Sequence, residues 1–265
     1  MLSNEYKEYC FKFDAVWRYL KSCSKDIDTI VSEICSLRKY YNEEARWGKI
    51  LREVEVVYVS SDTCDYSRFN KENFKDLALF SEKGNFLLNE RYIIPVRDML
   101  GNIVALIGWY PDSKRYITTP SRFFSKDCLF FGLEQIGRTG VGKDYFLVEG
   151  VFDSLAIRSV GFNAVAQMGL FNNNSVKSVL YGLFRRVIAI PDNDSGGRKV
   201  VSQNKWDIPQ NGSYLKWVGE VEIDGVKLNI KDIDNLINIF SEGDVCDLFK
   251  GVLKNKSRVI KIDLR

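Results

Sequence analysis

Apolar residues follow two periods along this chain, and the first of them is helical. Within residues 4–52, apolar and aromatic side chains recur every three or four positions, as amphipathic helices require, at Tyr6, Cys10, Phe13, Trp17 and Leu20. Asp28 is expected to cap a second helix that carries Ile30, Ile34 and Leu37. Aromatic residues at helical spacing face a core more often than they stack on bases. We therefore interpret them as packing residues.

The middle of the chain alternates with the period of two that is typical of β-strands. Residues 91–96 and 103–109 alternate in this way, and Gly101 stands in the segment between them. This pattern predicts a β-hairpin with a glycine in its turn. On such a hairpin, Arg91 and Arg97 are expected to lie on the same face.

The second half of the chain alternates between short apolar runs and helical stretches. We expect strands at 145–148, 163–167, 187–191 and 213–218, and helices at 153–160, 173–184 and 196–205. Continuous apolar runs followed by turn residues indicate buried parallel strands. Their alternation with helices predicts a mostly parallel sheet with helices on both faces. An extra hairpin is expected within 219–230, around Asp224 and Gly225.

Acidic residues stand where these strands are expected to end. Glu149 follows the first apolar run, Asp192 and Asp194 follow the third, and Asp232 and Asp234 come after the extra hairpin. Ligands of open α/β sheets collect beyond the carboxyl ends of the strands, so these acids are expected to converge. Mg²⁺ prefers oxygen ligands and usually combines one or two carboxylates with substrate phosphates. The sequence therefore predicts a magnesium site suited to phosphoryl transfer.

The order of these acids resembles a known signature. Glu149-Gly150 with Asp153, then Asp192-Asn193-Asp194 and Gly196-Gly197-Arg198, resembles the Toprim signature. DnaG-type primases, type IA and II topoisomerases and several nucleases share that fold. Runs further upstream resemble DnaG primases and not topoisomerases: RYIIPVRD from Arg91, GNIV from Gly101, RYITTP from Arg115, and Ser125-Lys126 with LFFGL from Leu129. The resemblance covers about residues 75–240.

The resemblance implies a role for each matching residue. Asp192, Asp194 and Asp232, together with Asp234, would bind Mg²⁺ or Mn²⁺. Glu149 would bind the metal or accept the proton of an attacking 3′-hydroxyl, which makes Glu149, Asp192 and Asp194 the candidate catalytic residues. Asp153 and Arg198 would orient those ligands. For a single acid at a strand end, the alternative is an ordinary turn or capping residue.

In the primases, arginines and lysines matching those of the hairpin region line a groove for template and nucleotide. Carried over to this chain, the nucleic-acid-binding and nucleotide-binding residues are Arg91, Arg97, Arg115, Tyr116 and Lys126. Trp109 stands where the family commonly has arginine, which removes one charge from the groove. An exposed tryptophan there could stack on a base instead. The alternative for the basic residues is an ordinary set of surface charges.

Composition and charge fit such a core without proving it. The chain has 265 residues, is 45% hydrophobic and has a net charge of +3, so it can bury a core of one or two domains. Residues 91–145 are mildly basic, with 8 Lys and Arg against 5 Asp and Glu. That excess is compatible with binding a phosphate backbone and also with an ordinary surface.

Cysteine and histidine usage argues against a zinc site. The 6 cysteines form no C-x-x-C pair and the chain has no histidine, so a Cys₄ or Cys/His zinc site is not expected. DnaG primases normally begin with a zinc-binding module, which we expect to be missing here. Without a signal peptide or a long apolar run, the sequence predicts a cytoplasmic protein with free thiols.

One glycine-rich run imitates a nucleotide-binding loop. Residues Gly137–Lys143 match the G-x-x-x-x-G-K pattern of P-loop ATPases. Asp144 stands where that loop has Ser or Thr, and an apolar strand follows where the loop needs a helix N-terminus. We interpret the run as a flexible linker between the two halves of the chain.

The leading hypothesis is a DnaG-type primase that makes short RNA primers on single-stranded DNA from NTPs with Mg²⁺ or Mn²⁺. The fold class expected is α/β, with a Rossmann-like Toprim sheet preceded by a mixed helical and hairpin subdomain. The domains expected are a polymerase subdomain at 1–143, a Toprim domain at 144–240 and a tail at 241–265 packing on it. A phage or mobile-element origin and a helicase or another replication protein as partner are further expectations. A Toprim nuclease and a non-catalytic replication accessory are the alternatives.

Overall fold

The computed structural model describes residues 3–40, 43–68, 72, 74–111, 115–119, 129–168, 174–203, 206–218, 221–223, 226–228 and 230–263. The chain divides into two compact units, Met1–Leu129 and Phe130–Arg265. In the part of the chain that is described, no helix has both the length and the apolar character needed to cross a membrane.

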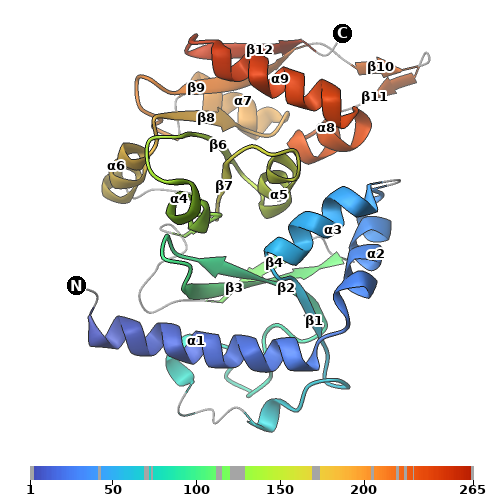
Figure 1. The fold of residues 1–265 in the computed structure, drawn as a ribbon, viewed down its shortest axis with the longest axis vertical. Coiled ribbons are helices and arrows are strands. Elements are labelled where there is room, and N and C mark those ends of the chain that lie inside the picture. Colours follow the sequence, from blue (N-terminus) through green and yellow to red (C-terminus); the bar gives the residue numbers. More distant parts are fainter. Residues whose placement is uncertain are drawn as a thin grey trace. The chain divides into compact units, whose positions relative to one another are not determined.

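The described residues of the first unit form helices and an antiparallel sheet (Figure 1). The helices are α1 (Asn4–Cys23), α2 (Ile27–Arg38) and α3 (Glu44–Glu53), and two short 3-10 turns follow at Tyr66–Arg68 and Lys75–Leu77. The sheet has the order β1 (Val57–Val59), β2 (Arg91–Arg97), β3 (Ile103–Tyr110) and β4 (Arg115–Thr118). The predicted hairpin is therefore confirmed as β2 and β3, which pair antiparallel.

Local capping explains where the first two helices begin. The Ser3 hydroxyl accepts a hydrogen bond from the Tyr6 N–H at 3.2 Å and starts α1. The Asp26 carboxylate accepts one from the Thr29 N–H at 2.8 Å and starts α2. The prediction that Asp28 caps this helix is wrong. Asp28 lies in its first turn, where it forms an ion pair with Arg52.

The apolar face of α1 packs onto the hairpin, as the helical spacing predicts. Phe13, Val16 and Leu20 are fully buried, and α1 contacts β1 and β3. The Tyr9 hydroxyl donates to the Val104 carbonyl at 3.0 Å, which ties the helix to β3. The aromatic residues of this stripe belong to the core, so the packing interpretation is confirmed for the buried members.

In the second unit, the described residues form a sheet with the strand order β12-β9-β8-β6-β7-β5. Strands β12 (Val259–Asp263), β9 (Ser213–Val218), β8 (Arg186–Ile190), β6 (Asp144–Val148) and β7 (Ala164–Gln167) are parallel, and β5 (Phe130–Phe131) is an antiparallel edge. The expected hairpin is present as β10 (Val221–Ile223) and β11 (Val226–Leu228). The predicted α/β fold class is confirmed.

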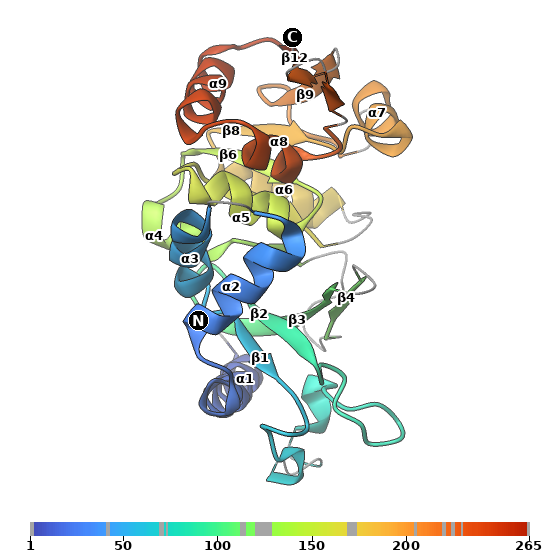
Figure 2. The same ribbon diagram turned by 90° about the vertical axis from the view of Figure 1, so that its right-hand side faces the viewer.

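Helices cover both faces of this sheet (Figure 2). Figure 2 shows α5 (Val151–Ser159), α8 (Ile233–Ile239) and α9 (Glu242–Lys254) on one side, with α6 (Asn174–Leu183) and α7 (Ser195–Ser202) on the other. Leu180, Tyr181 and Phe184 from α6 and the loop after it pack in one core cluster with Leu147 and Ala189 of the central strands. Burying the central strands on both faces is what their continuous apolar runs predict.

The glycine-rich run Gly137–Lys143 is part of this second unit. It spans the end of α4 (Glu134–Thr139) and a turn into β6, with Gly140 and Gly142 at φ of +82° and +76°. The Gly142 N–H donates to the Leu183 carbonyl at 2.8 Å. The expected flexible linker is thus a structured turn. A strand follows it where a phosphate-binding loop needs a helix, so the rejection of a P-loop is confirmed.

Candidate metal centre

Three loops at the carboxyl end of the parallel sheet bring the predicted acids together. Glu149 follows β6 and Asp192 follows β8, its neighbour in the sheet. A Glu149 carboxylate oxygen accepts a hydrogen bond from the Asp192 N–H at 3.2 Å, so the two loops are in contact. The third loop joins through Asn193, whose N–H donates to the Lys231 carbonyl at 2.6 Å and whose side chain donates to the Ile230 carbonyl at 2.8 Å.

Two of the acids also start helices. Asp194 accepts from the Gly197 N–H at 2.8 Å and caps α7, and Asp232 accepts from the Asn235 N–H at 2.8 Å and caps α8. An aspartate at a helix N-cap is stabilised by the unpaired N–H groups and by the helix dipole. Capping therefore fixes the position of each carboxylate. Asp194 and Asp232 thus have the ordinary capping role that the sequence analysis gave as the alternative, and they also stand in the acidic loops.

Asp153 and Asp234 connect α5 to α8. Asp234 is buried in the first turn of α8, and its N–H donates to an Asp153 carboxylate oxygen at 3.2 Å. The Asn238 amide donates to the Asp234 carboxylate at 3.1 Å. Asp153 thus contacts the first turn of α8, and its role in orienting the other acids stays a prediction. The Asp234 side chain is buried, so it is less accessible to a metal ion than the acids at the surface of the loops.

The electrostatics of the loops show that the carboxylates act on one another. Desolvation, and then the charges of Glu149 and Asp232, raise the pKa of Asp192 to about 7. Desolvation raises the pKa of Asp153 well above its ordinary range, with Asp232, Asp234 and Asp192 adding to the effect. Partial desolvation and the Asp194 charge likewise raise the pKa of Glu149. The loops therefore bring several carboxyl groups close together, and the Lys231 charge offsets only part of their mutual influence on the pKa of Asp192.

The donor set fits Mg²⁺ or Mn²⁺ bound together with a substrate. Among the described residues, no three His, Cys, Asp or Glu side chains come close enough to form a complete metal cage. Mg²⁺ does not require one, because it is commonly bound by one or two carboxylates plus substrate phosphates and water. Carboxylates on neighbouring loops supply that arrangement, and Asp192 with Glu149, Asp194 or Asp232 are the residues that fit.

Glycine 197 is what allows the second loop to fold this tightly. A Cβ atom at this buried position would lie 1.8 Å from the Asp192 carbonyl oxygen, far inside van der Waals contact. The adjacent Gly196 leaves 3.1 Å to its nearest neighbour, the Asp194 carboxylate. The first turn of α7 therefore approaches Asp192 as closely as a backbone without a side chain permits.

Two residues of the site were missed by the sequence analysis. Asn193 joins the loops, and the Lys231 charge lowers the pKa of Glu149 and Asp192. Both stand next to predicted acids, so their position in the chain was the available signal. Arg198, predicted to orient ligands, lies exposed on α7, and its backbone N–H donates to the Asp194 carbonyl at 3.0 Å.

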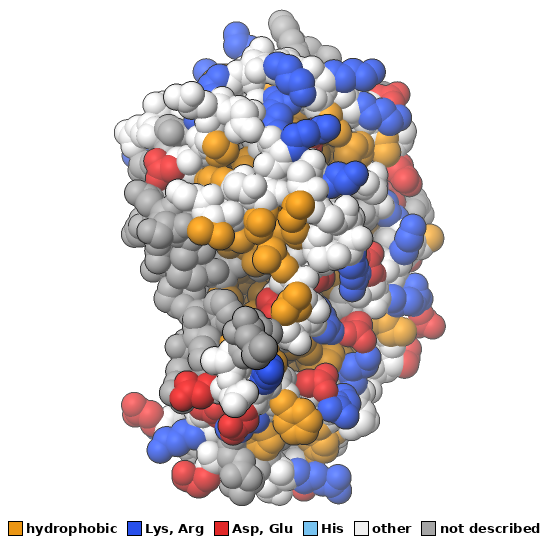
Figure 3. Space-filling model, turned by 60° about the vertical axis from the view of Figure 1, so that its left-hand side comes forward, with side chains coloured by type: hydrophobic (Ala, Val, Ile, Leu, Met, Phe, Trp, Pro, Cys, Tyr) orange, Lys and Arg blue, Asp and Glu red, His pale blue; other side chains and the backbone are white. Residues whose placement is uncertain are grey.

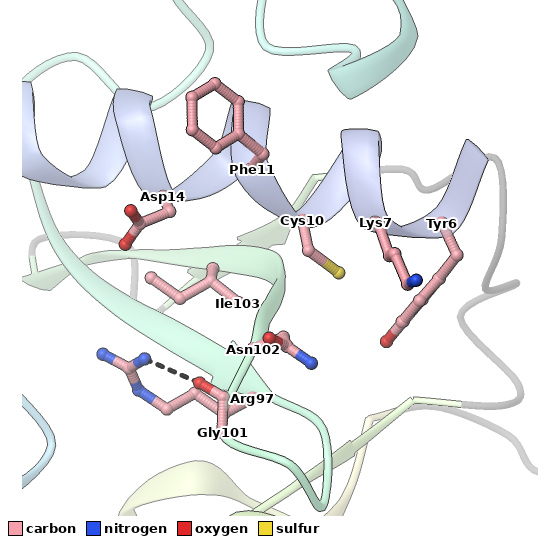
Figure 4. A pocket seen from close by; sticks show the side chains of 9 residues that line it. All are labelled: Tyr6, Lys7, Cys10, Phe11, Asp14, Arg97, Gly101, Asn102 and Ile103. Atoms are coloured by element: carbon pink, nitrogen blue, oxygen red, sulfur yellow. Dashed lines mark hydrogen bonds between the residues drawn. The ribbon is translucent and has the colours of Figure 1, made fainter. Parts of the chain in front are cut away.

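The candidate nucleic-acid-binding residues of the first unit have partners within that unit. Arg97 forms an ion pair with Glu55 and donates to the Gly101 carbonyl at 3.0 Å. It lines a pocket of about 340 Å³ between α1 and the hairpin (Figure 4). The Arg91 guanidinium lies over the Tyr110 ring at 5.3 Å and donates to the Leu87 carbonyl at 3.3 Å.

Two of the remaining predicted positions belong to β4. Tyr116 is 40% exposed, and Arg115 belongs to the same strand. Lys126 lies outside the described residues. Trp109 is only 2% exposed and packs against Tyr92, with Arg38 over its ring at 5.5 Å. The expectation of an exposed tryptophan that stacks on a base is therefore wrong.

Comparison with known protein families finds a match within the second unit. Residues 146–237 match the protein family described as Toprim-like, so this part of the chain is similar to Toprim-like domains. The match begins within β6 and ends within α8, and it includes all the acids of the candidate metal centre.

A larger part of the chain is related to a primase. It is 25% identical over 229 residues to a DNA primase of Mycoplasma genitalium. The aligned region covers 82% of this chain and 36% of that protein. The chain thus spans little more than a third of the length of this relative.

Solved structures of DnaG primases share the fold. A DnaG primase catalytic domain bound to single-stranded DNA matches 92% of this chain and 78% of its own, with a TM-score of 0.69 and 18% identity. The RNA polymerase domain of Mycobacterium tuberculosis DnaG, in complex with double-stranded DNA, matches 94% of this chain and 81% of its own, with a TM-score of 0.66 and 19% identity. The Escherichia coli primase catalytic core matches 83% of this chain and 72% of its own, with a TM-score of 0.61 and 19% identity. The chain has the fold of the DnaG catalytic core.

Proposed function

We propose that this chain is a DnaG-type primase core that makes short RNA primers on a single-stranded DNA template from NTPs. The observation that carries the proposal is the convergence of three acidic loops in the Toprim-like domain of a chain that has the DnaG fold throughout. The structure with bound single-stranded DNA supports the choice of template. A helicase or another replication protein as partner, a cytoplasmic setting and a phage or mobile-element origin remain parts of this proposal.

The acids would divide the work of nucleotidyl transfer. Asp192, Asp194 and Asp232 would bind Mg²⁺ or Mn²⁺, with Glu149 completing the site and the buried Asp234 supporting it from behind. The bound metal supplies charge stabilisation for the phosphates of the incoming nucleotide. Glu149 would accept the proton of the attacking 3′-hydroxyl, a role that its raised pKa favours. Asp153 would maintain the geometry by its hydrogen bond from Asp234.

The first unit would bind the template. Arg91, Arg97, Arg115, Tyr116 and Lys126 remain the candidates for that surface. Arg97 would exchange its partner Glu55 for a phosphate, which is feasible because the pair is partly exposed. No zinc-binding module is part of the proposed core, since the cysteines of the chain form no C-x-x-C pair and histidine is absent from it.

The direct test is synthesis from labelled NTPs. Purified protein is incubated with single-stranded DNA and Mg²⁺ or Mn²⁺, beside an Asp192→Ala/Asp194→Ala variant, and the products are resolved on a denaturing gel. The proposal expects short labelled oligomers that the variant does not make. Shortened DNA with the same dependence on the two acids would instead establish a nuclease. Binding of the strand with neither product would favour a non-catalytic accessory.

A further inference from the structure

A second cavity opens beside the acidic loops, within the Toprim-like domain. It has a volume of about 570 Å³ and lies between α7 and the β9–β12 edge of the sheet. Asp192 and Asn193 line one end, Val201 and Ser202 of α7 one wall, and Lys216 and Val259 of the two strands the other. We name it the α7 pocket. It begins at the candidate metal centre and leads away from it.

Cations surround this pocket. Arg198 and Lys199 of α7 and Lys216 of β9 line it, and the parallel register of β9 and β12 places Lys261 beside Lys216. All four residues are exposed. Figure 3 shows Lys and Arg side chains gathered at the end of this unit where β12 lies in Figure 1.

Several cations of the first unit pair with acids, whereas the described structure shows no acidic partner for the cations around the α7 pocket. Within the described part of the chain, no ion pair engages Arg198, Lys199, Lys216 or Lys261, whereas Arg97 and Lys21 share Glu55 and Lys25 pairs with Glu33. Several uncompensated cations around one concave surface attract a ligand that carries several negative charges. Val201 and Val259 add an apolar wall, against which a sugar or a base can pack.

We propose that the α7 pocket binds the phosphate backbone of the growing strand, close to its 3′ end. This inference rests on the proposed polymerase function. The 3′ end of a growing strand must lie at the metal-binding acids, so its preceding nucleotides must leave the site along an adjoining surface. The α7 pocket adjoins Asp192 and carries the charge that phosphates require.

The test compares primed and unprimed templates. A Lys199→Ala/Lys216→Ala variant removes two rim charges that lie outside the acidic site. Lys254→Ala/Lys256→Ala removes two exposed charges from the end of α9 and the loop after it, and serves as the matched control. Fluorescence anisotropy follows binding, at several salt concentrations, to a labelled DNA strand with or without an annealed RNA primer that cannot be extended.

The inference expects the rim variant to bind primed template about tenfold more weakly at low salt, with a slope of log K against log salt that is smaller by about two. Its affinity for the unprimed strand, and both affinities of the control, should match wild type. Unchanged binding of primed template by the rim variant would overturn the inference, as would equal losses on the unprimed strand or in the control.

Failure of this inference is distinct from failure of the proposed function. If wild-type protein synthesises oligomers and the rim variant binds primed template as wild type does, only the α7 pocket loses its role. If wild-type protein synthesises nothing with either metal, the polymerase function fails, and with it the basis of the inference.

Discussion

The two units treat their charged residues in opposite ways. In the first unit, Arg97 and Lys21 share Glu55. Desolvation is the largest single influence on the pKa of Glu55 and would raise it, but Lys21 and Arg97 together outweigh it and lower the pKa. In the second unit, desolvation and then the charges of Glu149 and Asp232 raise the pKa of Asp192 to about 7. The first arrangement stabilises the fold, and the second costs folding free energy unless a cation compensates it. The comparison indicates that the acidic loops are built for a ligand.

Neutralising one acid of the loops is expected to have the largest effect. Asp192→Asn keeps the size of the side chain but removes a proposed metal ligand, so NTP incorporation should fall by about 100-fold or more. The measurement is the rate of labelled oligomer synthesis at saturating Mg²⁺. Asp247→Asn is the control, because this exposed acid of α9 pairs with Lys250 at the surface. Synthesis by Asp192→Asn at the rate of the control would refute the role of Asp192.

A change of backbone in the same loop should be nearly as damaging. Gly197→Ala places a Cβ atom against the Asp192 carbonyl oxygen, so the loop must move and synthesis should fall by about 100-fold. Gly196→Ala provides a matched control, since its Cβ meets only the Asp194 side chain, at 3.1 Å. Equal activity of the two alanine variants would show that the close approach of α7 to Asp192 is unimportant.

In metal-free protein, the dependence of stability on pH should show the cost of ionising Asp192 in the folded state, which we call the charge conflict. With its ordinary pKa of 3.8 raised to about 7 by folding, Asp192 keeps its proton in the folded state while the unfolded state loses it. Its contribution to stability is therefore present below pH 4 and is lost as the pH rises toward 7, by an amount on the order of 1–3 kcal/mol.

Urea unfolding of wild type and Asp192→Asn between pH 4.5 and 7.5 measures this contribution. It is the difference between the free energies of unfolding of the two proteins at each pH. Carboxyls that Asp192 does not influence, such as Asp144 with its lowered pKa, contribute equally to both proteins and cancel. The pKa of Asp153, which the Asp192 charge helps to raise, is expected to fall in the variant, and this change adds to the same difference. The variant should gain on wild type as the pH rises. A difference that stays constant across this range would contradict the charge conflict.

Removing the Arg97–Glu55 ion pair of the first unit should have the smallest effect. It should lower the free energy of unfolding, whereas Asp192→Asn should raise it in metal-free protein. Arg97→Met removes a partly exposed ion pair with Glu55, so the free energy of unfolding should fall by about 1 kcal/mol at neutral pH. Thermal unfolding with and without Mg²⁺ checks this, and the stabilisation by Mg²⁺ should equal that of wild type. A smaller Mg²⁺ effect in this variant would remove the distinction between the two regions.

The sequence predicted the sheet of the second unit well because its strands are continuous apolar runs that end on acids. The convergence of Glu149 and Asp192 follows from that pattern, since β6 and β8 are parallel neighbours. The strand β12 was not predicted. Its alternating residues Val259–Asp263 form an edge whose pairing with β9 depends on contacts distant in sequence.

Other features depended on geometry that local patterns do not contain. Asp26 and Asp28 are both suitable caps, and the choice of Asp26 was decided by its hydrogen bonds with Thr29. The burial of Trp109 depends on Tyr92 and Arg38, which come from other elements. That Asp194 and Asp232 each cap a helix could not be predicted without the exact first residues of α7 and α8.

The most direct test of the account is the effect of Mg²⁺ on the unfolding of wild type and Asp192→Asn at pH 7.5. Mg²⁺ at about 100 times its dissociation constant should stabilise wild type by about 2.7 kcal/mol, while Asp192→Asn, more stable than wild type without metal, should gain much less. Equal stabilisation of both proteins, or a metal-free variant less stable than wild type, would contradict the claim that these loops are a metal site.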